Sequence, residues 1–205
     1  MKVLKWIIIG IVAIFILTLF IPGADEKEES VTELPAVENA VEKPDILIDS
    51  AKINELKSLF NYKKDEFSED QLEWITPKAA PVYRNENGIY CYFSKDNLRF
   101  VFQYHSDDWL FIQEYKFLID DKPYSFSPKE VKRDNDETGI TEWFDVQVRS
   151  DDKALEIVKA LATAKSAKVK LVGNNFVDVK TISPKQLKSI RNTYEYFKAR
   201  GNKIY

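Results

Sequence analysis

The feature that most constrains this chain is its apolar N-terminus, MKVLKWIIIGIVAIFILTLFIPG. The run from Trp6 to Ile21 contains 16 uncharged, mostly apolar residues, and as an α-helix it would be about 24 Å long. Lys2 and Lys5 precede the run and acidic residues follow it, so the positive flank is expected to stay inside while the rest is exported. We therefore predict a single-pass transmembrane signal-anchor over residues 1–23. The C-terminal domain would lie outside, periplasmic or extracellular.

A cleaved signal peptide is the alternative interpretation of the same residues. The sequence IPGAD is a poor small-x-small cleavage site, because Pro22 would occupy position −3. We therefore expect an uncleaved anchor, and a mature chain that begins near Asp25 would contradict it.

An acidic stretch follows the apolar segment. Residues 25–45 contain eight acids and two lysines, a net charge of −6, with no aromatic residue and with Pro35 and Pro44 as helix breakers. Such a stretch buries too little apolar surface to offset the entropy of ordering it. We predict an acidic disordered linker over residues 24–45 and one extracytoplasmic domain over residues 46–205.

Hydrophobic periodicity predicts the elements of that domain. Apolar residues at helical spacing behind capping residues predict helices over residues 49–62, 151–165 and 184–200. Alternating or β-branched and aromatic runs between turn signals predict strands over residues 89–93, 98–104, 109–119, 124–126, 141–149, 167–173 and 176–182. The proline-containing residues 73–88 are expected to form a loop. Short connections between strands indicate an α+β fold, a mostly antiparallel sheet with two or three packed helices, preceded by one transmembrane helix.

The stretch YHSDDWLFIQEYKFLID contains the only histidine of the chain, His105, beside two acids. Small polar side chains after Tyr104 are typical of a turn, because they bond their own backbone. From Trp109 onwards apolar residues occupy both alternating positions, which is typical of a strand covered on both sides. We predict a strand that begins at Trp109, and not a catalytic cluster.

Two stretches, DDWLFIQEYKFLID and AKVKLVGNNFVDVKTISPKQLKSIRNTYEYFKARG, resemble uncharacterised bacterial cell-envelope proteins and lipoproteins. This chain departs from the lipoproteins because no cysteine lies near its N-terminus. The resemblance implies a place in the bacterial cell envelope, with the predicted anchor in the bacterial cytoplasmic membrane, and no particular activity.

Few residues are suited to catalysis. A nucleophile needs an adjacent base, and the only imidazole, His105, is expected to point to the opposite strand face from the serine that follows it. Cys91, the only cysteine, falls inside a predicted strand and is expected to be a core residue. The adjacent acids at 107–108, 120–121 and 151–152 fall at element ends, where turn and cap roles explain them. We assign no catalytic residue.

The motif DNDETGITEWFD, residues 134–145, has the oxygen-ligand spacing of an EF-hand calcium loop. The candidate ligands are Asp134, Asp136, Thr138 and Asp145. The short Thr and Asp side chains at the fifth and twelfth positions and the absence of flanking helices weaken this interpretation. The alternative is an acidic turn that leads into the next strand. Calcium is the only cofactor suggested, since one His and one Cys cannot build a usual zinc site.

Charge is distributed unevenly along the chain. Residues 153–205 contain 12 Lys and Arg against three acids, a net of +9, whereas residues 46–152 have a net of −8. The two segments can neutralise one another by packing together, or the last helix and hairpin can present a basic face. The candidate ligand-binding residues of that basic face are Lys168, Lys170, Lys185, Lys188 and Arg191. It would meet an envelope protein, an anionic lipid or a wall polymer, and no nucleic acid is expected in that compartment.

Aromatic residues are numerous, with 4 Trp, 10 Tyr and 13 Phe. Exposed rings can stack on sugars, as in a wall-binding module, but most of these rings are expected on strand faces, where core packing is the default. Trp74, beside a proline-containing loop, is the ring that core packing explains least.

The sequence favours a membrane-anchored extracytoplasmic binding or interaction module of the bacterial envelope, attached to the membrane through its N-terminal helix. Two alternatives stay open. An extracytoplasmic hydrolase would use scattered carboxylates, and its sign would be a deep pocket where two carboxylates converge. A structural or immunity-type protein would occupy the surface of a partner, and its sign would be an exposed apolar patch without a pocket.

Overall fold

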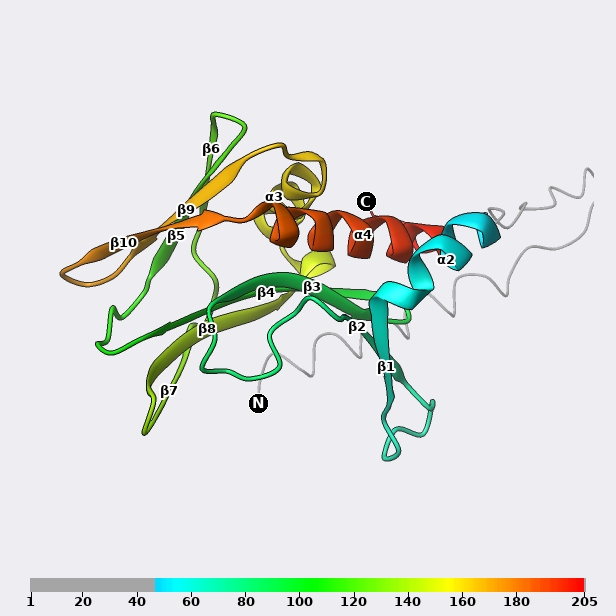
Figure 1. Cartoon of the computed structure of the whole chain (residues 1–205), viewed down its shortest axis with the longest axis horizontal. Coiled ribbons are helices and arrows are strands. Elements are labelled where there is room, and N and C mark those ends of the chain that lie inside the picture. Colours follow the sequence, from blue (N-terminus) through cyan, green and yellow to red (C-terminus); the bar gives the residue numbers. More distant parts are fainter. Residues whose placement is uncertain (1–46, 205) are drawn as a thin grey trace, which may run out of the picture. The chain divides into compact units, whose positions relative to one another are not determined.

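The computed structural model of the chain describes residues 47–204 (Figure 1). The predicted signal-anchor over residues 1–23 and the predicted linker over residues 24–45 lie outside the described residues. Among the helices of residues 47–204, none has the length and apolar character needed to cross a membrane.

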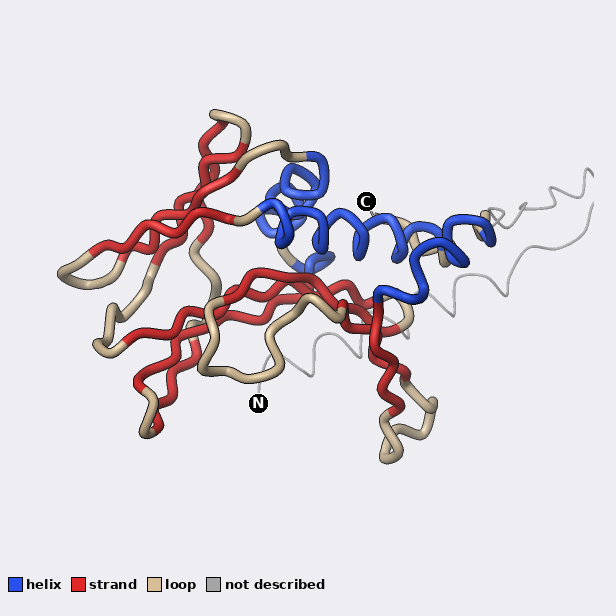
Figure 2. Tube along the Cα trace, in the orientation of Figure 1, coloured by secondary structure: helices blue, strands red, loops and turns tan. Residues whose placement is uncertain are grey.

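Ten strands and three α-helices make up the described part of the chain (Figure 2). The helices are α2 (Ser50–Leu56), α3 (Asp152–Thr163) and α4 (Pro184–Ala199). The strands are β1 (Phe60–Lys64), β2 (Glu73–Pro77), β3 (Gly88–Ser94), β4 (Asn97–Ser106), β5 (Glu114–Ile119), β6 (Lys122–Phe126), β7 (Lys132–Asp136), β8 (Gly139–Gln147), β9 (Ala167–Val172) and β10 (Val177–Ile182). They form a six-stranded sheet, β1-β2-β3-β4-β8-β7, and a four-stranded sheet, β10-β9-β5-β6. All pairs are antiparallel, so the predicted α+β class is confirmed, with two sheets.

The six-stranded sheet buries one of its faces under α4. Figure 1 shows α4 running along this sheet. The Phe93 ring of β3 packs edge-on against Phe197 of α4, with 5.3 Å between the ring centroids. Phe60 of β1 stacks on Tyr196 of α4 at 4.7 Å. Residues that alternate with these on the strands point to the other face of the sheet, away from α4.

The four-stranded sheet packs on the same buried face, beside α4. The Phe102 ring of β4 lies 5.3 Å from Tyr115 of β5, and the Phe144 ring of β8 lies 4.9 Å from the same Tyr115. Both contacts are edge-to-face, the arrangement that the ring quadrupoles favour. The side chains under α4 and those between the two sheets belong to one continuous core.

The ends of α3 and α4 lie where the sequence predicts. At the start of α4, Ser183 Oγ accepts a hydrogen bond from the Gln186 N–H at 3.3 Å, and Gln186 Oε1 accepts one from the Ser183 N–H at 2.8 Å. Asp151 caps α3 by accepting the Ala154 N–H at 3.1 Å. Gly201, with φ of +84°, follows α4. The predicted helix over residues 49–62 is shorter in the structure, because a single 3₁₀ turn leads from α2 directly into β1.

The segment that crosses from the larger to the smaller sheet, residues 107–113, corrects a prediction. We predicted a strand that begins at Trp109, but the residues between β4 and β5 are irregular and β5 begins only at Glu114. Phe111 has a φ of +53°, which is incompatible with a continuous strand. Leu110 and Ile112 of this crossing segment are buried at a junction between two sheets rather than on the two faces of one, whereas Phe111 is 45% exposed.

Glu142 of β8 supplies the hydrogen-bond acceptors that a neighbouring strand would otherwise provide. Its side chain is fully buried. Glu142 Oε1 accepts the N–H groups of Leu110 and Phe111, both at 2.8 Å, and Oε2 accepts the N–H of Ile112 at 2.8 Å. Arg133 Nε donates to Glu142 Oε2 at 3.0 Å, and Arg133 Nη2 donates to the Ile112 carbonyl at 3.0 Å. The carboxylate is thus compensated by one cation and three backbone donors.

Gly173 allows the β9–β10 hairpin to approach the crossing segment closely. A Cβ atom at this position would lie 1.9 Å from the Leu110 carbonyl oxygen. No side chain fits there, so the position requires glycine. The Asn174 N–H donates to the same carbonyl at 3.3 Å.

Three strands were missed by the sequence prediction. β1 and β7 form the two edges of the larger sheet, and every residue of β7 is exposed, so no alternating apolar pattern marks it. Residues of β2 fall in the proline-containing stretch that we expected to be a loop. Pro77, which has no N–H to donate to the sheet, occupies the last position of β2.

Replacing Glu142 by alanine is expected to destabilise the protein by about 3–5 kcal/mol, because the buried N–H groups of Leu110 and Ile112, the partly buried N–H of Phe111 and the Arg133 guanidinium lose their acceptor together. Urea unfolding of the full chain in non-ionic detergent, followed by tryptophan fluorescence, measures this loss. Glu137→Ala, in the exposed β7–β8 turn, is the control and should change stability by about 0.5 kcal/mol or less. Equal loss for both variants would contradict the role given to Glu142.

Candidate functional site

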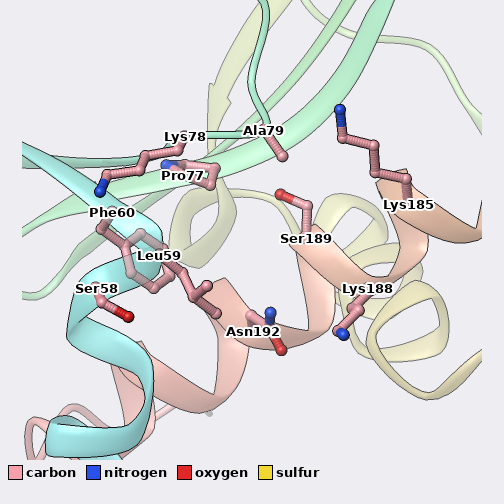
Figure 3. Close-up of a pocket in the computed structure, with 10 residues that line it drawn as sticks. All are labelled: Ser58, Leu59, Phe60, Pro77, Lys78, Ala79, Lys185, Lys188, Ser189 and Asn192. Carbon is pink, nitrogen blue, oxygen red and sulfur yellow. The ribbon is translucent and has the colours of Figure 1, made fainter.

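A pocket of about 380 Å³ lies between α4 and the segments on either side of the β1–β2 hairpin (Figure 3). We call it the lysine pocket. Its lining residues are Ser58, Leu59, Phe60, Pro77, Lys78, Ala79, Lys185, Lys188, Ser189 and Asn192. The volume lies in the range that small-ligand sites occupy.

Apolar side chains make one wall of the lysine pocket. Phe60 of β1 pairs with Pro77 of β2. The Phe60 ring stacks on the Tyr196 ring of α4. Leu59 is 41% exposed, which is high for a side chain of this size and type. The Lys78 N–H donates to the Leu59 carbonyl at 2.9 Å and so ties the two ends of the hairpin together. This wall suits the carbon skeleton of a ligand.

Three lysines surround the opening. Lys185 and Lys188 are three residues apart and therefore share a face of α4, and Lys78 comes from the end of β2 (Figure 3). All three are exposed, and none of them forms an ion pair with an acid of residues 47–204. No described carboxylate lines the pocket. The site therefore carries an uncompensated positive charge.

Ser189 adds a polar group to the interior of the lysine pocket. The residue is only 7% exposed, and its hydroxyl has no hydrogen-bond partner among the described residues. Buried hydroxyl groups nearly always have a partner, so this one calls for an explanation. In Figure 3 the side chain of Ser189 turns towards the segment that carries Ala79.

The residues of the predicted basic face are distributed over three places. Lys185 and Lys188 line the lysine pocket. Lys168 and Lys170 lie on the exposed side of β9 in the smaller sheet. Arg191 is half-buried and caps the end of α3, because its Nε donates to the Ala162 carbonyl at 2.8 Å and its Nη2 to the Ala164 carbonyl at 2.9 Å. Lys78 lies outside the predicted basic face, because it follows β2, whose residues fall in the stretch that the sequence predicts to be a loop.

The candidate calcium ligands are not brought together. Asp134 and Asp136 lie on β7, and Thr138 follows in the turn, where Asp136 Oδ1 accepts the Thr138 N–H at 2.7 Å. Asp145 lies farther along β8 and accepts from Arg99 Nε at 2.8 Å instead. In residues 47–204 no group of three or more His, Cys, Asp or Glu side chains is arranged to hold a metal ion. Strand pairing of β7 with β8 replaces the loop that the motif suggested.

Two of the adjacent acids, Asp120 and Asp151, have structural roles. Asp120 lies in the β5–β6 turn, where its carboxylate accepts the N–H groups of Ser166 and Lys165, and these hydrogen bonds lower its pKa. Asp151 caps α3. A pocket of about 220 Å³ is lined by Asp145, Asp151 and Glu130, but the first is paired with Arg99 and the second serves the helix. It lacks the two free, converging carboxylates expected of a hydrolase.

His105 and Cys91 do not form a catalytic pair. His105 Nδ1 lies 3.4 Å from the Thr141 hydroxyl on the neighbouring strand β8. Cys91 is 1% exposed and belongs to the core, as predicted.

No protein-family model, no curated protein and no solved structure matches this chain.

Cys91 is expected to be inert in the folded protein, because burial raises the pKa of its thiol and keeps it protonated. The thiol reagent DTNB should react with it only after denaturation. A control chain that carries Cys91→Ser together with Asn175→Cys, in the exposed β9–β10 turn, should react at once. Rapid reaction of Cys91 in the native chain would contradict its assignment as a core residue.

Proposed function

We propose that this chain is a membrane-anchored extracytoplasmic module of the bacterial envelope that binds an anionic ligand in the lysine pocket. The anchor, the compartment and the envelope assignment come from the apolar N-terminal segment, its charged flanks and the resemblance to envelope proteins. The single observation that supports binding is the cluster of three lysines, Lys78, Lys185 and Lys188, around an apolar wall, none of which forms an ion pair within residues 47–204.

Of the partners that the sequence suggests, an anionic lipid fits the lysine pocket best. A phosphate group would accept hydrogen bonds from the ammonium groups of Lys185 and Lys188. The glycerol carbons beside the phosphate would then contact Leu59 and Pro77. The Ser189 hydroxyl would donate a hydrogen bond to the same ligand after a rotation of its side chain. A wall polymer or an acidic protein offers the anion without this adjacent apolar part.

Neutralising Lys185 and Lys188 is expected to weaken binding of a short-chain phosphatidylglycerol about 100-fold or more, since the change removes two charge-assisted hydrogen bonds that contribute about 1.5–3 kcal/mol each. Calorimetric titration of the full chain in non-ionic detergent measures the affinity, with short-chain phosphatidylcholine as the uncharged-headgroup comparison. The variant is Lys185→Gln with Lys188→Gln.

Lys168→Gln with Lys170→Gln is the matched control, because it removes the same charge from the exposed side of β9. This control should bind like the unmodified chain. Equal losses in the two double variants, or equal affinity for the two lipids, would contradict the lysine pocket as the site. Binding of an acidic polymer in the absence of lipid binding would contradict the choice of lipid.

Ser189→Ala separates a role in binding from a role in folding. Removing a buried hydroxyl that has no partner is expected to leave the free energy of unfolding unchanged or higher. Binding of the lipid is expected to weaken, because the ligand loses a hydrogen bond. A variant that unfolds more easily and binds normally would show that Ser189 serves the fold alone.

The structural or immunity-type alternative has one observation in its favour. Phe176, Val177 and Val179, at the edge strand β10, are 70%, 53% and 54% exposed. An edge strand that exposes apolar side chains can pair with another chain. The lysine pocket lies on a different part of the domain, so this surface would add a partner and would not replace the ligand.

A further inference from the structure

The outer face of the six-stranded sheet, turned away from α4, carries a row of three aromatic rings. Ile75, Cys91 and Phe93 point into the core, so Trp74 of β2 and Tyr90 and Tyr92 of β3 alternate with them and point outwards. The ring centroids of Trp74 and Tyr92 are 5.4 Å apart, and those of Tyr92 and Tyr90 are 6.3 Å apart.

Core packing does not account for these rings. All three are half-buried, and none belongs to the hydrophobic core of the described residues or to the side chains packed against it. The segment between β2 and β3 covers the neighbouring part of the outer face, where Gln103 Nε2 donates to the Tyr83 carbonyl at 2.9 Å. Figure 1 shows the β1–β2 and β7–β8 turns extending to the side of the sheet opposite α4, so they flank the outer face.

Hydrogen-bonding groups lie directly beside the rings. The Tyr92 hydroxyl donates to Asp145 Oδ2 at 2.7 Å, which fixes the orientation of the ring. Arg99 Nε donates to Asp145 Oδ1 at 2.8 Å, and Arg99 Nη2 donates to the Asp145 carbonyl at 2.8 Å. Both side chains are partly exposed, at 25% for Arg99 and 17% for Asp145. They keep free donors and acceptors for a ligand.

A pocket of about 580 Å³ adjoins Trp74. Its lining residues are Lys63, Lys64, Asp65, Glu66, Phe67, Trp74 and Thr76. The charges of its two lysines and two acids cancel, and the charge of Arg99 is likewise cancelled by that of Asp145 beside Tyr92. The row ends where the Arg84 guanidinium covers the Trp143 ring at 4.6 Å. This part of the outer face thus offers rings, donors and acceptors with little net charge.

We propose that the outer face binds a neutral polysaccharide, with one sugar ring in the pocket against Trp74 and the next on Tyr92. The apolar C–H face of a sugar stacks on an aromatic ring, and its hydroxyl groups both donate and accept hydrogen bonds. The balance of charges complements an uncharged ligand. Nucleic acids also stack on aromatic rows, but they need a positively charged groove. The proposal is independent of the lysine pocket, which lies on the α4 side of the sheet.

Affinity electrophoresis of the full chain in non-ionic detergent tests the proposal. Native gels contain dextran, laminarin or hydroxyethylcellulose as neutral polymers, or polygalacturonate as the acidic polymer, and a single-stranded oligonucleotide is tested by its own mobility shift. At least one neutral polymer is expected to retard the chain. Trp74→Ala should weaken this binding about tenfold or more, as expected for the loss of one stacking ring.

Two further variants serve as controls. Trp74→Phe keeps a ring and should retain part of the retardation. Phe176→Ala removes an aromatic ring that is 70% exposed on the other sheet, and it should migrate like the unmodified chain. Unfolding curves of each variant establish that the fold is intact.

Three outcomes would overturn the proposal. One is a chain that no neutral polymer of the panel retards. Another is equal retardation of Trp74→Ala and the unmodified chain. The third is tighter binding of polygalacturonate or of the oligonucleotide than of every neutral polymer, which would assign the outer face to a polyanion.

Discussion

A buried carboxylate on β8 determines how the two sheets of this chain meet. The backbone has to leave the larger sheet after β4 and enter the smaller sheet at β5, and the N–H groups of Leu110, Phe111 and Ile112 find no strand beside them on the way. Glu142 accepts all three. A buried charge is costly unless it is paired and hydrogen-bonded, and here the crossing segment and Arg133 compensate it together. The acceptor and its donors therefore require one another.

The position of both candidate ligand surfaces depends on this junction. Because the crossing segment fixes β5, it also fixes β9, which pairs with β5, and β10, which pairs with β9. The chain passes from β10 through Ser183 directly into α4. That helix then brings Lys185 and Lys188 to the end of the β1–β2 hairpin. With α4 and the smaller sheet both on one side of the larger sheet, the rings of its outer face are left outside the core.

Structural features that depend on residues close together in the chain could be predicted from the sequence. Features that depend on contacts between distant segments could not. The capping box at Ser183 predicted the start of α4 correctly, because its hydrogen bonds are local. The apolar pattern of the crossing segment predicts a buried strand. Only the fold shows that its backbone N–H groups donate to the Glu142 carboxylate on β8. Two of the three lysines of the lysine pocket, Lys185 and Lys188, belong to the predicted basic face, but Lys78 joins them from a distant strand end. Tyr90 and Tyr92 alternate with apolar residues in a fully apolar strand, so the sequence could not say which side faces solvent.

Hydrogen exchange at single amides tests the junction most directly. If Glu142 holds the crossing segment, the amides of Leu110, Phe111 and Ile112 exchange as slowly as those of the central strand β4, although they lie in irregular backbone. Exchange of these three amides as fast as that of the exposed Asp107 and Asp108 beside them would show that the carboxylate does not hold the segment, and the placement of everything that follows it in the chain would need another cause.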